Sequence, residues 1–398
     1  MPIPRTAALR LKDAAWLRDD DTQQVFALLD GRKDRTRAVG GIVRDTMLER
    51  LRETRDIDFA TELLPEEVME RATKSGIPAY PTGIEHGTVT LRVGEMIAEV
   101  TTLREDVETD GRHAVVKFGT NWLRDAERRD FTLNALYVGM DGRLFDPIGG
   151  IEDCLAGAVR FIGDADKRIV EDRLRVYRFF RFSASHGGEQ YDAEGLAAVT
   201  RASSDLDGLS AERVGGEMRR MLVLPRIAKT LRTMAEAGVL PFGDDVLERL
   251  TRYERHAPKP DAVSRLALIT AKSDALDLRE AWRLTNDEMQ RSHAILAAAA
   301  LLADFDLHEV AYRFPSVLAE SLEVASVLAG WTEAGRAAVV EQLRAIDVPI
   351  FPLRGSDLLA AGMKPGPALG SELERLERRW IESGFALDRA ALLKDLKR

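Results

Sequence analysis

Two neighbouring stretches decide the fold of this chain: residues 39–45, Val-Gly-Gly-Ile-Val-Arg-Asp, and residues 56–58, Asp-Ile-Asp. Residues 36–41 have the composition of a strand that runs into a glycine turn, and apolar residues at helical spacing follow the turn from Ile42 to Leu51. Residues 56–61 alternate in polarity, which predicts a second strand. Side chains two residues apart on a strand point to the same face, so the two aspartates present their carboxylates together.

The chemistry of this pair points to a divalent cation. Adjacent ionised carboxylates repel each other, and hard oxygen ligands suit Mg²⁺. An Asp-x-Asp pair alone is a weak signal, but after Gly-Gly-x-Val-Arg-Asp it becomes specific, because the glycine turn lets backbone N–H groups approach phosphate and Arg44 adds positive charge. We therefore predict a two-metal site held by Asp56 and Asp58. Glu99, on a strand that could pair beside Asp58, is the candidate third catalytic carboxylate; the alternative is an exposed glutamate paired with an arginine.

Hydrophobic periodicity predicts an α+β chain. A helix is expected at residues 65–74, with proline in its first turn, and hairpins are expected around residues 94–95 and 140–142. Beyond residue 152 the pattern is helical, including one long helix from Asp166 to Ala184. We expect a head with a mixed or antiparallel sheet and then an all-α part: head 1–151, helical neck 152–225, and all-α body and tail 226–398.

Composition narrows the classes of function. The net charge of −9 argues against a broad nucleic-acid-binding surface, so any RNA partner has to meet local clusters of arginine and lysine. Cys154 is the only cysteine, which excludes an internal disulfide and a thiolate zinc cluster. The sequence shows neither a signal peptide nor a membrane-spanning run, and a cytoplasmic location is the expectation.

Two arginine-rich motifs follow the carboxylates. In residues 128–134, Arg-Arg-Asp-Phe-Thr-Leu-Asn, guanidinium groups suit a triphosphate and a carboxylate suits a ribose hydroxyl, although a salt-bridged surface would look the same. In residues 171–181, Asp172 and Arg175 fall within one turn of the expected helix. This second motif is interpreted either as a base-reading pair with a phosphate-binding run or as an ordinary charged helix face.

Taken together, these motifs resemble the class II tRNA nucleotidyltransferase and bacterial poly(A) polymerase family, a branch of the polymerase-β-like nucleotidyltransferases. The matching segments are residues 39–45 with 56–58, 128–136, 171–175, and Ser210-Ala-Glu-Arg213 with Glu217. One departure is Arg173, where the family commonly has proline.

The resemblance implies a polymerase-β-like head and two-metal nucleotidyl transfer with Mg²⁺, adding CMP and AMP from CTP and ATP to the 3′ end of tRNA. DNA and membranes are not expected partners. It also implies roles for individual residues. Asp56, Asp58 and Glu99 are catalytic, and the nucleotide contacts are Gly41, Arg44, Arg129, Asp130, Asp172, Arg175, Arg178 and Arg181.

Alternatives stay open within and outside this family. Poly(A) enzymes typically carry a strongly basic C-terminal extension, whereas this chain is acidic, so CCA addition is favoured. Residues 110–112, Asp-Gly-Arg, resemble the flexible loop of enzymes that add all three nucleotides rather than CC alone. A non-catalytic RNA-binding relative is disfavoured because both Asp56 and Asp58 are present.

Overall fold

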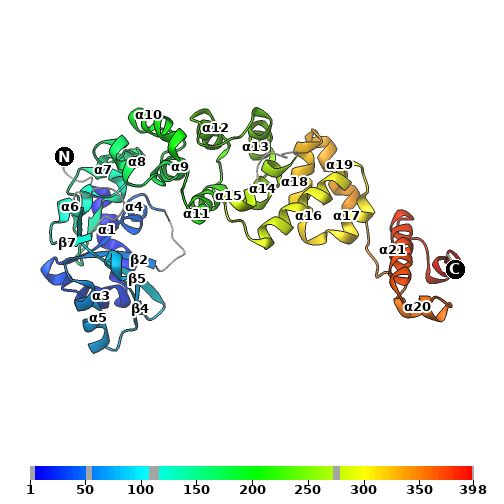
Figure 1. Ribbon diagram of the computed structural model, residues 1–398, viewed down its shortest axis with the longest axis horizontal. Helices are drawn as coiled ribbons and strands as arrows, with labels where there is room; N and C mark the ends of the chain where they lie inside the picture. Colours follow the sequence, from blue (N-terminus) through cyan, green and yellow to red (C-terminus); the bar gives the residue numbers. More distant parts are fainter. Residues whose placement is uncertain (1–4, 51–55, 107–115, 272–277, 397–398) are drawn as a thin grey trace. The chain divides into compact units, whose positions relative to one another are not determined.

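The computed structural model of the chain describes residues 5–50, 56–106, 116–271 and 278–396. The chain divides into two compact units, coloured from blue to green and from green to red in Figure 1. The first comprises Met1–Leu209 with Glu236–Val239, and the second Ser210–Ala235 with Leu240–Arg398. Residues 110–112 of the expected loop lie outside the described residues.

The first unit is built on a mixed sheet, as predicted. Its seven described strands have the order β3-β4-β5-β2-β1-β8-β9, in which β2 and β5 run parallel and the other neighbours antiparallel. The strands are β1 (Thr36–Val39), β2 (Asp56–Thr61), β3 (Ala79–Gly83), β4 (Thr88–Val93), β5 (Met96–Thr102), β8 (Tyr137–Val138) and β9 (Leu144–Phe145), with β6 (Arg104–Asp106) and β7 (Val116–Phe118) forming a separate pair.

Local sequence signals account for several of these elements. The helix predicted at residues 65–74 is α5 (Pro65–Lys74), with proline in its first turn. Both predicted hairpins are confirmed: β4 pairs with β5 around Gly94, and β8 pairs with β9 around residues 140–142. The helix expected after the glycine turn is α4 (Gly41–Met47), which is shorter than the apolar spacing suggested.

One face of the sheet packs on a helix that precedes β1 in the sequence. Ile57 and Phe59 of β2 point to this face and are buried. The ring of Phe59 meets that of Phe26, on α3 (Asp20–Leu28), edge-on at 5.2 Å between centroids. The alternation along β2 therefore leaves the aspartates on the opposite face.

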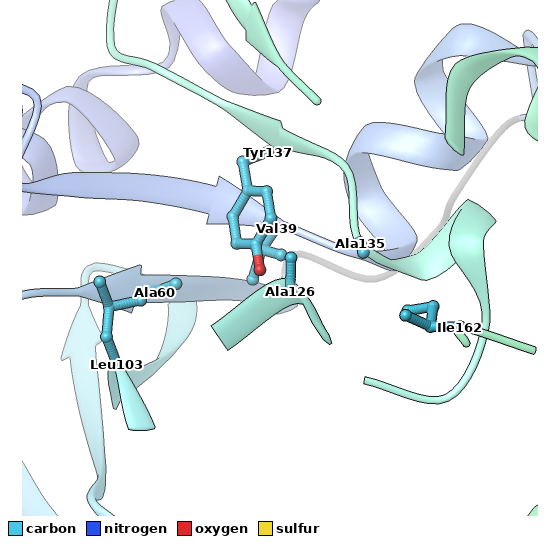
Figure 2. Packing of buried hydrophobic residues seen from close by; sticks show 7 residues of the cluster. All are labelled: Val39, Ala60, Leu103, Ala126, Ala135, Tyr137 and Ile162. Atoms are coloured by element: carbon cyan, nitrogen blue, oxygen red, sulfur yellow. The ribbon is translucent and has the colours of Figure 1, made fainter. Parts of the chain in front are cut away.

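The opposite face is covered along part of its length by α6 (Trp122–Glu127). Val39, Ala60 and Tyr137 form a buried cluster there with Ala126 of α6. In Figure 2 the tyrosine ring crosses the strand of Val39, and its hydroxyl points toward Ala126. Ala60 shares its face of β2 with the two aspartates, so α6 and the carboxylates lie on the same side of the sheet.

The helices that complete the first unit correct one prediction. The single helix expected from Asp166 to Ala184 is wrong: Asp172 has extended backbone angles, with φ −149° and ψ 101°, and separates two helices. Its side chain accepts a hydrogen bond from the Leu174 N–H at 3.1 Å, which competes with helical hydrogen bonding. The remaining helices of the unit are α1 (Arg5–Asp13), α2 (Ala15–Arg18), α7 (Gly150–Ala156), α8 (Ala165–Glu171), α9 (Arg175–Ser185) and α10 (Ala193–Ala202), with short 3₁₀ turns that include η3 (Thr132–Asn134) and η4 (Ser203–Asp205).

The second unit is helical over its described residues, as predicted for the all-α part. Fully buried Arg265 donates to the carbonyls of Leu222 and Leu224 at 2.6 Å, and so satisfies the end of α11. Trp380 anchors a separate apolar cluster near the C-terminus. The helices are α11 (Ala211–Leu222), α12 (Ala228–Glu236), α13 (Asp244–His256), α14 (Ala262–Thr270), α15 (Leu278–Ala281), α16 (Asn286–Ala303), α17 (Leu307–Arg313), α18 (Leu318–Leu328), α19 (Glu333–Arg344), α20 (Gly355–Ala360), α21 (Pro367–Glu382) and α22 (Arg389–Lys394). None of the described helices is long and apolar enough to span a membrane.

Candidate active site

The glycine turn and the aspartates meet at one end of the sheet. β1 and β2 are antiparallel, with Ala38 opposite Phe59, so the end of β1 lies beside the start of β2. Gly40 follows β1 with φ +73° and ψ −124°, a conformation that residues with a side chain rarely adopt, and its N–H donates to the Leu136 carbonyl at 3.0 Å. The chain then turns into α4 at Gly41, close to the two carboxylates.

The three predicted carboxylates share one exposed sheet face. Asp58 and Glu99 are direct partners across the parallel pair β2–β5, which confirms the predicted strand pairing. All three side chains, including that of Asp56, lie at exposed positions. Partial burial, and then the negative charges of Asp58 and Asp56, raise the pKa of Glu99 above its usual range. The three groups therefore interact as a cluster of negative charge.

The donor set fits a magnesium ion that is shared with a substrate. Mg²⁺ in proteins is usually held by one or two carboxylates and completed by water and substrate phosphates. Asp56 and Asp58 supply such a pair of oxygen ligands on one strand face. Within residues 5–50, 56–106, 116–271 and 278–396, no three acidic, histidine or cysteine side chains are gathered closely enough to bind a metal by themselves. The pair thus suits an ion that arrives with a nucleotide.

The arginines of the second motif are held by a buried aspartate on α6. Asp125 is 1% exposed and accepts hydrogen bonds from Arg128 Nη2 at 2.6 Å and from Arg129 Nη2 at 3.1 Å. Arg129 Nε also donates to the Tyr137 hydroxyl, which donates to Asp125. Burial alone would raise the pKa of Asp125, but the two arginine charges outweigh it and lower the pKa to about 2. Both guanidinium groups are thus oriented by the protein.

A second set of buried polar groups links α4, η3 and α9. Arg44, only 5% exposed, donates from Nη1 to Asn134 Oδ1 at 2.6 Å. Asn134 Nδ2 donates to Asp130 Oδ1 at 3.0 Å, and Arg178 Nη2 contacts Asp130 Oδ2 at 2.6 Å. Burial would raise the pKa of Asp130, but the Arg178 charge and the hydrogen bonds hold it below the usual range. Residues from all three predicted motifs therefore take part in a single network.

The network continues to a histidine at the end of α9. Asp45 Oδ1 accepts from Arg44 Nε at 2.8 Å and lies 3.2 Å from His186 Nε2. The other ring nitrogen of His186 is 2.7 Å from Ser185 Oγ. Burial lowers the pKa of His186 to about 4, so the ring is neutral near pH 7. We call His186, Asp45, Arg44, Asn134, Asp130 and Arg178 the motif-linking network.

The proposed base-reading residues lie at the break between α8 and α9. Asp172 is the first residue after α8, three positions before α9 begins, and the Arg175 N–H donates to its carbonyl at 3.0 Å. The Arg175 guanidinium donates to the carbonyls of Arg168 at 2.9 Å and Arg128 at 3.0 Å, and to Glu171 at 2.7 Å. These contacts place the base-reading pair next to the second motif.

The two remaining arginines of the third motif have different surroundings. The Arg181 guanidinium lies over the Phe182 ring at 4.0 Å from its centroid. Arg173, which stands where the family commonly has proline, forms an ion pair with Asp205 of η4. A helix nevertheless begins two residues later, where the Asp172 side chain accepts from the N–H of Leu174, the residue that precedes α9.

Sequence reasoning assigned no role to three residues that organise this site. Asp125 could have been found, since it precedes Arg128 and Arg129 by one helical turn. Asn134 lies inside the quoted motif, but its bond to Arg44 spans 90 positions. His186 is 141 positions from Asp45, and no local sequence pattern predicts that these two residues are in contact.

Comparison with known proteins gives the fold and the site a family. Residues 36–160 match the Poly A polymerase head domain. CCA tRNA nucleotidyltransferase 1, mitochondrial, of Danio rerio is 33% identical over 98% of this chain and 94% of its own length. The chain belongs to the CCA tRNA nucleotidyltransferase family.

Other members of the family agree over nearly the whole chain. The CCA-adding enzyme of Leuconostoc mesenteroides is 29% identical, covering 95% of this chain and 96% of its own. The crystal structure of the Bacillus stearothermophilus CCA-adding enzyme in complex with CTP has a TM-score of 0.75 and 26% identity, covering 92% of this chain and 94% of that one. Nucleotidyltransferases of this family generally use a divalent metal ion.

Proposed function

We propose that this chain adds CMP and AMP to the 3′ end of tRNA, with CTP and ATP as substrates and Mg²⁺ as the metal. The observation that carries the proposal is the strand-face pair Asp56 and Asp58 beside the glycine turn, in a chain related over nearly its full length to CCA tRNA nucleotidyltransferases. In the reaction the tRNA 3′-hydroxyl attacks the α-phosphorus of the nucleotide and pyrophosphate leaves. Mg²⁺ held by the two aspartates would supply charge neutralisation and help to ionise the hydroxyl.

The side chains around the carboxylates suit a nucleoside triphosphate. Gly41 leaves the backbone accessible to phosphate, and Arg129 is oriented in advance by Asp125 and Tyr137. Arg178 and Arg181 would add positive charge for the phosphates, and Glu99 would assist at the metal-binding face. For Asp130 and Arg44, burial favours an indirect role over direct contact, with Asp130 near the ribose and Arg44 behind it.

Base selection is proposed for Asp172 and Arg175. Cytosine and adenine each present an amino donor beside a ring-nitrogen acceptor, whereas uracil and guanine present a carbonyl beside an N–H. A carboxylate only accepts and a guanidinium only donates, so this pair matches C and A and mismatches U and G. The contacts of Arg175 with the Arg128 carbonyl and Glu171 hold its guanidinium beside the second motif.

We also propose that the chain is divided as expected into a head (1–151), a neck (152–225) and a body and tail (226–398). The head would hold the metal, the neck would read the base, and the body and tail would bind tRNA. A cytoplasmic location is also proposed, although the Danio rerio relative is named as mitochondrial. Localisation of the tagged chain in its own cells would distinguish the two compartments.

The decisive experiment is a transfer assay with tRNA that lacks its 3′-terminal CCA. With CTP, ATP and Mg²⁺ we expect products one, two and three nucleotides longer, in the order C, C, A, and no addition when EDTA is present. Long adenosine tails made from ATP alone would instead favour poly(A) addition, the activity named by the matching head-domain family. Binding of tRNA without any addition would favour a non-catalytic relative.

A further inference from the structure

The motif-linking network contains a histidine to which no role has been assigned. His186 follows α9 directly, and its side chain is 9% exposed. It reaches back to Asp45 on α4, a residue 141 positions earlier in the chain. Burial of a polar ring and a carboxylate costs free energy unless both groups form hydrogen bonds. The contact between His186 and Asp45 supplies such a bond.

The direction of each hydrogen bond follows from the charges. The Arg44 charge and the hydrogen bonds outweigh the effect of burial and keep the pKa of Asp45 well below its usual range, so its carboxylate only accepts. His186 Nε2 must therefore carry the hydrogen that points at Asp45 Oδ1. The same oxygen accepts from Arg44 Nε at 2.8 Å. Histidine and arginine thus fix this carboxylate from two sides.

The orientation is passed on through Arg44. A planar guanidinium whose Nε is fixed has a fixed direction for Nη1, which donates to Asn134 Oδ1 at 2.6 Å. Holding that oxygen also decides which way the Asn134 amide turns, and its Nδ2 then faces Asp130. Asp130 in turn meets Arg178, one helical turn after Arg175 on α9.

We propose that His186 is a positioning residue for nucleotide binding. Through Asp45, Arg44 and Asn134 it sets the orientation of the Asp130 carboxylate and of the Arg178 side chain. This inference rests on the proposed function, in which Asp130 and Arg178 serve the sugar and phosphates. Those parts are common to CTP and ATP, so His186 affects both nucleotides equally and leaves base preference unchanged.

The test compares two substitutions with the wild-type chain. His186→Phe keeps a ring but removes the N–H donor, whereas in His186→Gln the side-chain amide can still donate to Asp45. Loss of a hydrogen bond to a charged group corresponds to a factor of roughly ten or more. We expect the KM values for CTP and ATP to rise about ten-fold in His186→Phe and to return to within about two-fold of wild type in His186→Gln.

Three readouts separate positioning from a general loss of structure. The KM for tRNA and the preference for CTP over UTP should stay near wild type in His186→Phe, and circular dichroism should show the helix content of the wild type. His308→Phe is the matched control, because His308 is a half-buried histidine that packs on Phe385 in the second unit. If His186→Phe does not fold, His186→Asn, whose amide is too short to reach Asp45, replaces it.

Equilibrium binding of CTP keeps this inference distinct from the proposed function. A wild-type chain that binds CTP but transfers nothing would contradict the proposed function, while the His186 variants would still report on positioning. Unchanged CTP affinity and unchanged KM in His186→Phe would overturn the inference. So would a loss that His186→Gln shares in full, because the N–H donor would then be irrelevant.

Discussion

The carboxylates and the arginines of this site differ in their exposure to solvent and in their hydrogen bonding. Asp56, Asp58 and Glu99 lie at exposed positions on a sheet face, where partial burial and then the like charges of the aspartates raise the pKa of Glu99. Arg44 and Arg129, by contrast, are enclosed and hydrogen-bonded to protein acceptors. The difference supports our proposal that the carboxylates bind a cation from solution, whereas the guanidinium groups are already oriented by the protein.

Removing a carboxylate should have the largest effect. Asp56→Asn or Asp58→Asn deletes one charged oxygen ligand of the proposed metal, and we expect nucleotide addition to fall by roughly a thousand-fold or more. Binding of tRNA should remain, since its affinity would come from basic side chains elsewhere. Turnover and tRNA binding are to be measured on the same preparations, and near-normal turnover in either variant would remove the two-metal proposal.

Substitutions in the base-reading pair, Asp172 and Arg175, should have the next largest effect. Arg175→Ala and Asp172→Ala should lower kcat/KM for CTP and ATP. The difference in kcat/KM between these two nucleotides and UTP or GTP should become smaller. Each lost match is worth about 1–3 kcal/mol, or about 5–150-fold in discrimination. Steady-state kinetics with all four nucleotides measure this effect. Wild-type preference in both variants would show that the start of α9 is only a charged helix face.

A substitution of Asp125 tests, through protein stability, how the arginines of the site are held in place. Its pKa in the folded chain is about 2, against an ordinary value of 3.8, so its ionised form favours folding. This contribution is complete above the unfolded-state pKa and is lost as the pH falls from about 4 to about 2. We expect Asp125→Asn to lower the free energy of unfolding by about 2 kcal/mol at pH 7.

Denaturant unfolding at several pH values checks this prediction. The difference between wild type and Asp125→Asn should shrink on acidification below about pH 4. Asp166→Asn is the matched control, because Asp166 is paired with Arg201 at the exposed surface, where an ion pair contributes little to stability. A difference between wild type and Asp125→Asn that does not depend on pH would contradict the assigned charge pairing.

The smallest effect is expected at the far end of the chain. Arg375 and Arg379 of α21 pair with Glu372 and Asp395, whereas neighbouring Arg378 is exposed. If Arg378 contacts a tRNA phosphate, Arg378→Gln should raise the KM for tRNA a few-fold and reduce the salt slope of binding by roughly 0.7–0.9. Arg344→Gln, at an exposed position on α19, is the control. An unchanged salt dependence of tRNA binding would indicate that Arg378 is not part of the surface that binds tRNA.

Local sequence patterns determined much of the head. Alternation predicted β2 and placed Asp56 and Asp58 on one face, and proline marked the start of α5. Glu99 was also predicted to lie on a strand that could pair beside Asp58, and the structure pairs these two residues. The alternation of β2 and the start of α5 depend on neighbours along the chain, whose geometry is set by the backbone itself.

Only the tertiary structure decided how the motifs meet. Helical spacing continued through Asp172, yet a side-chain hydrogen bond to the backbone ended the helix there. Arg44 was expected at the nucleotide, but folding buries it against Asn134, 90 positions away. His186 and Asp45 are brought together in the same manner. Periodicity reports which face of an element is buried and not which distant partner it meets, because that choice is made when the elements pack.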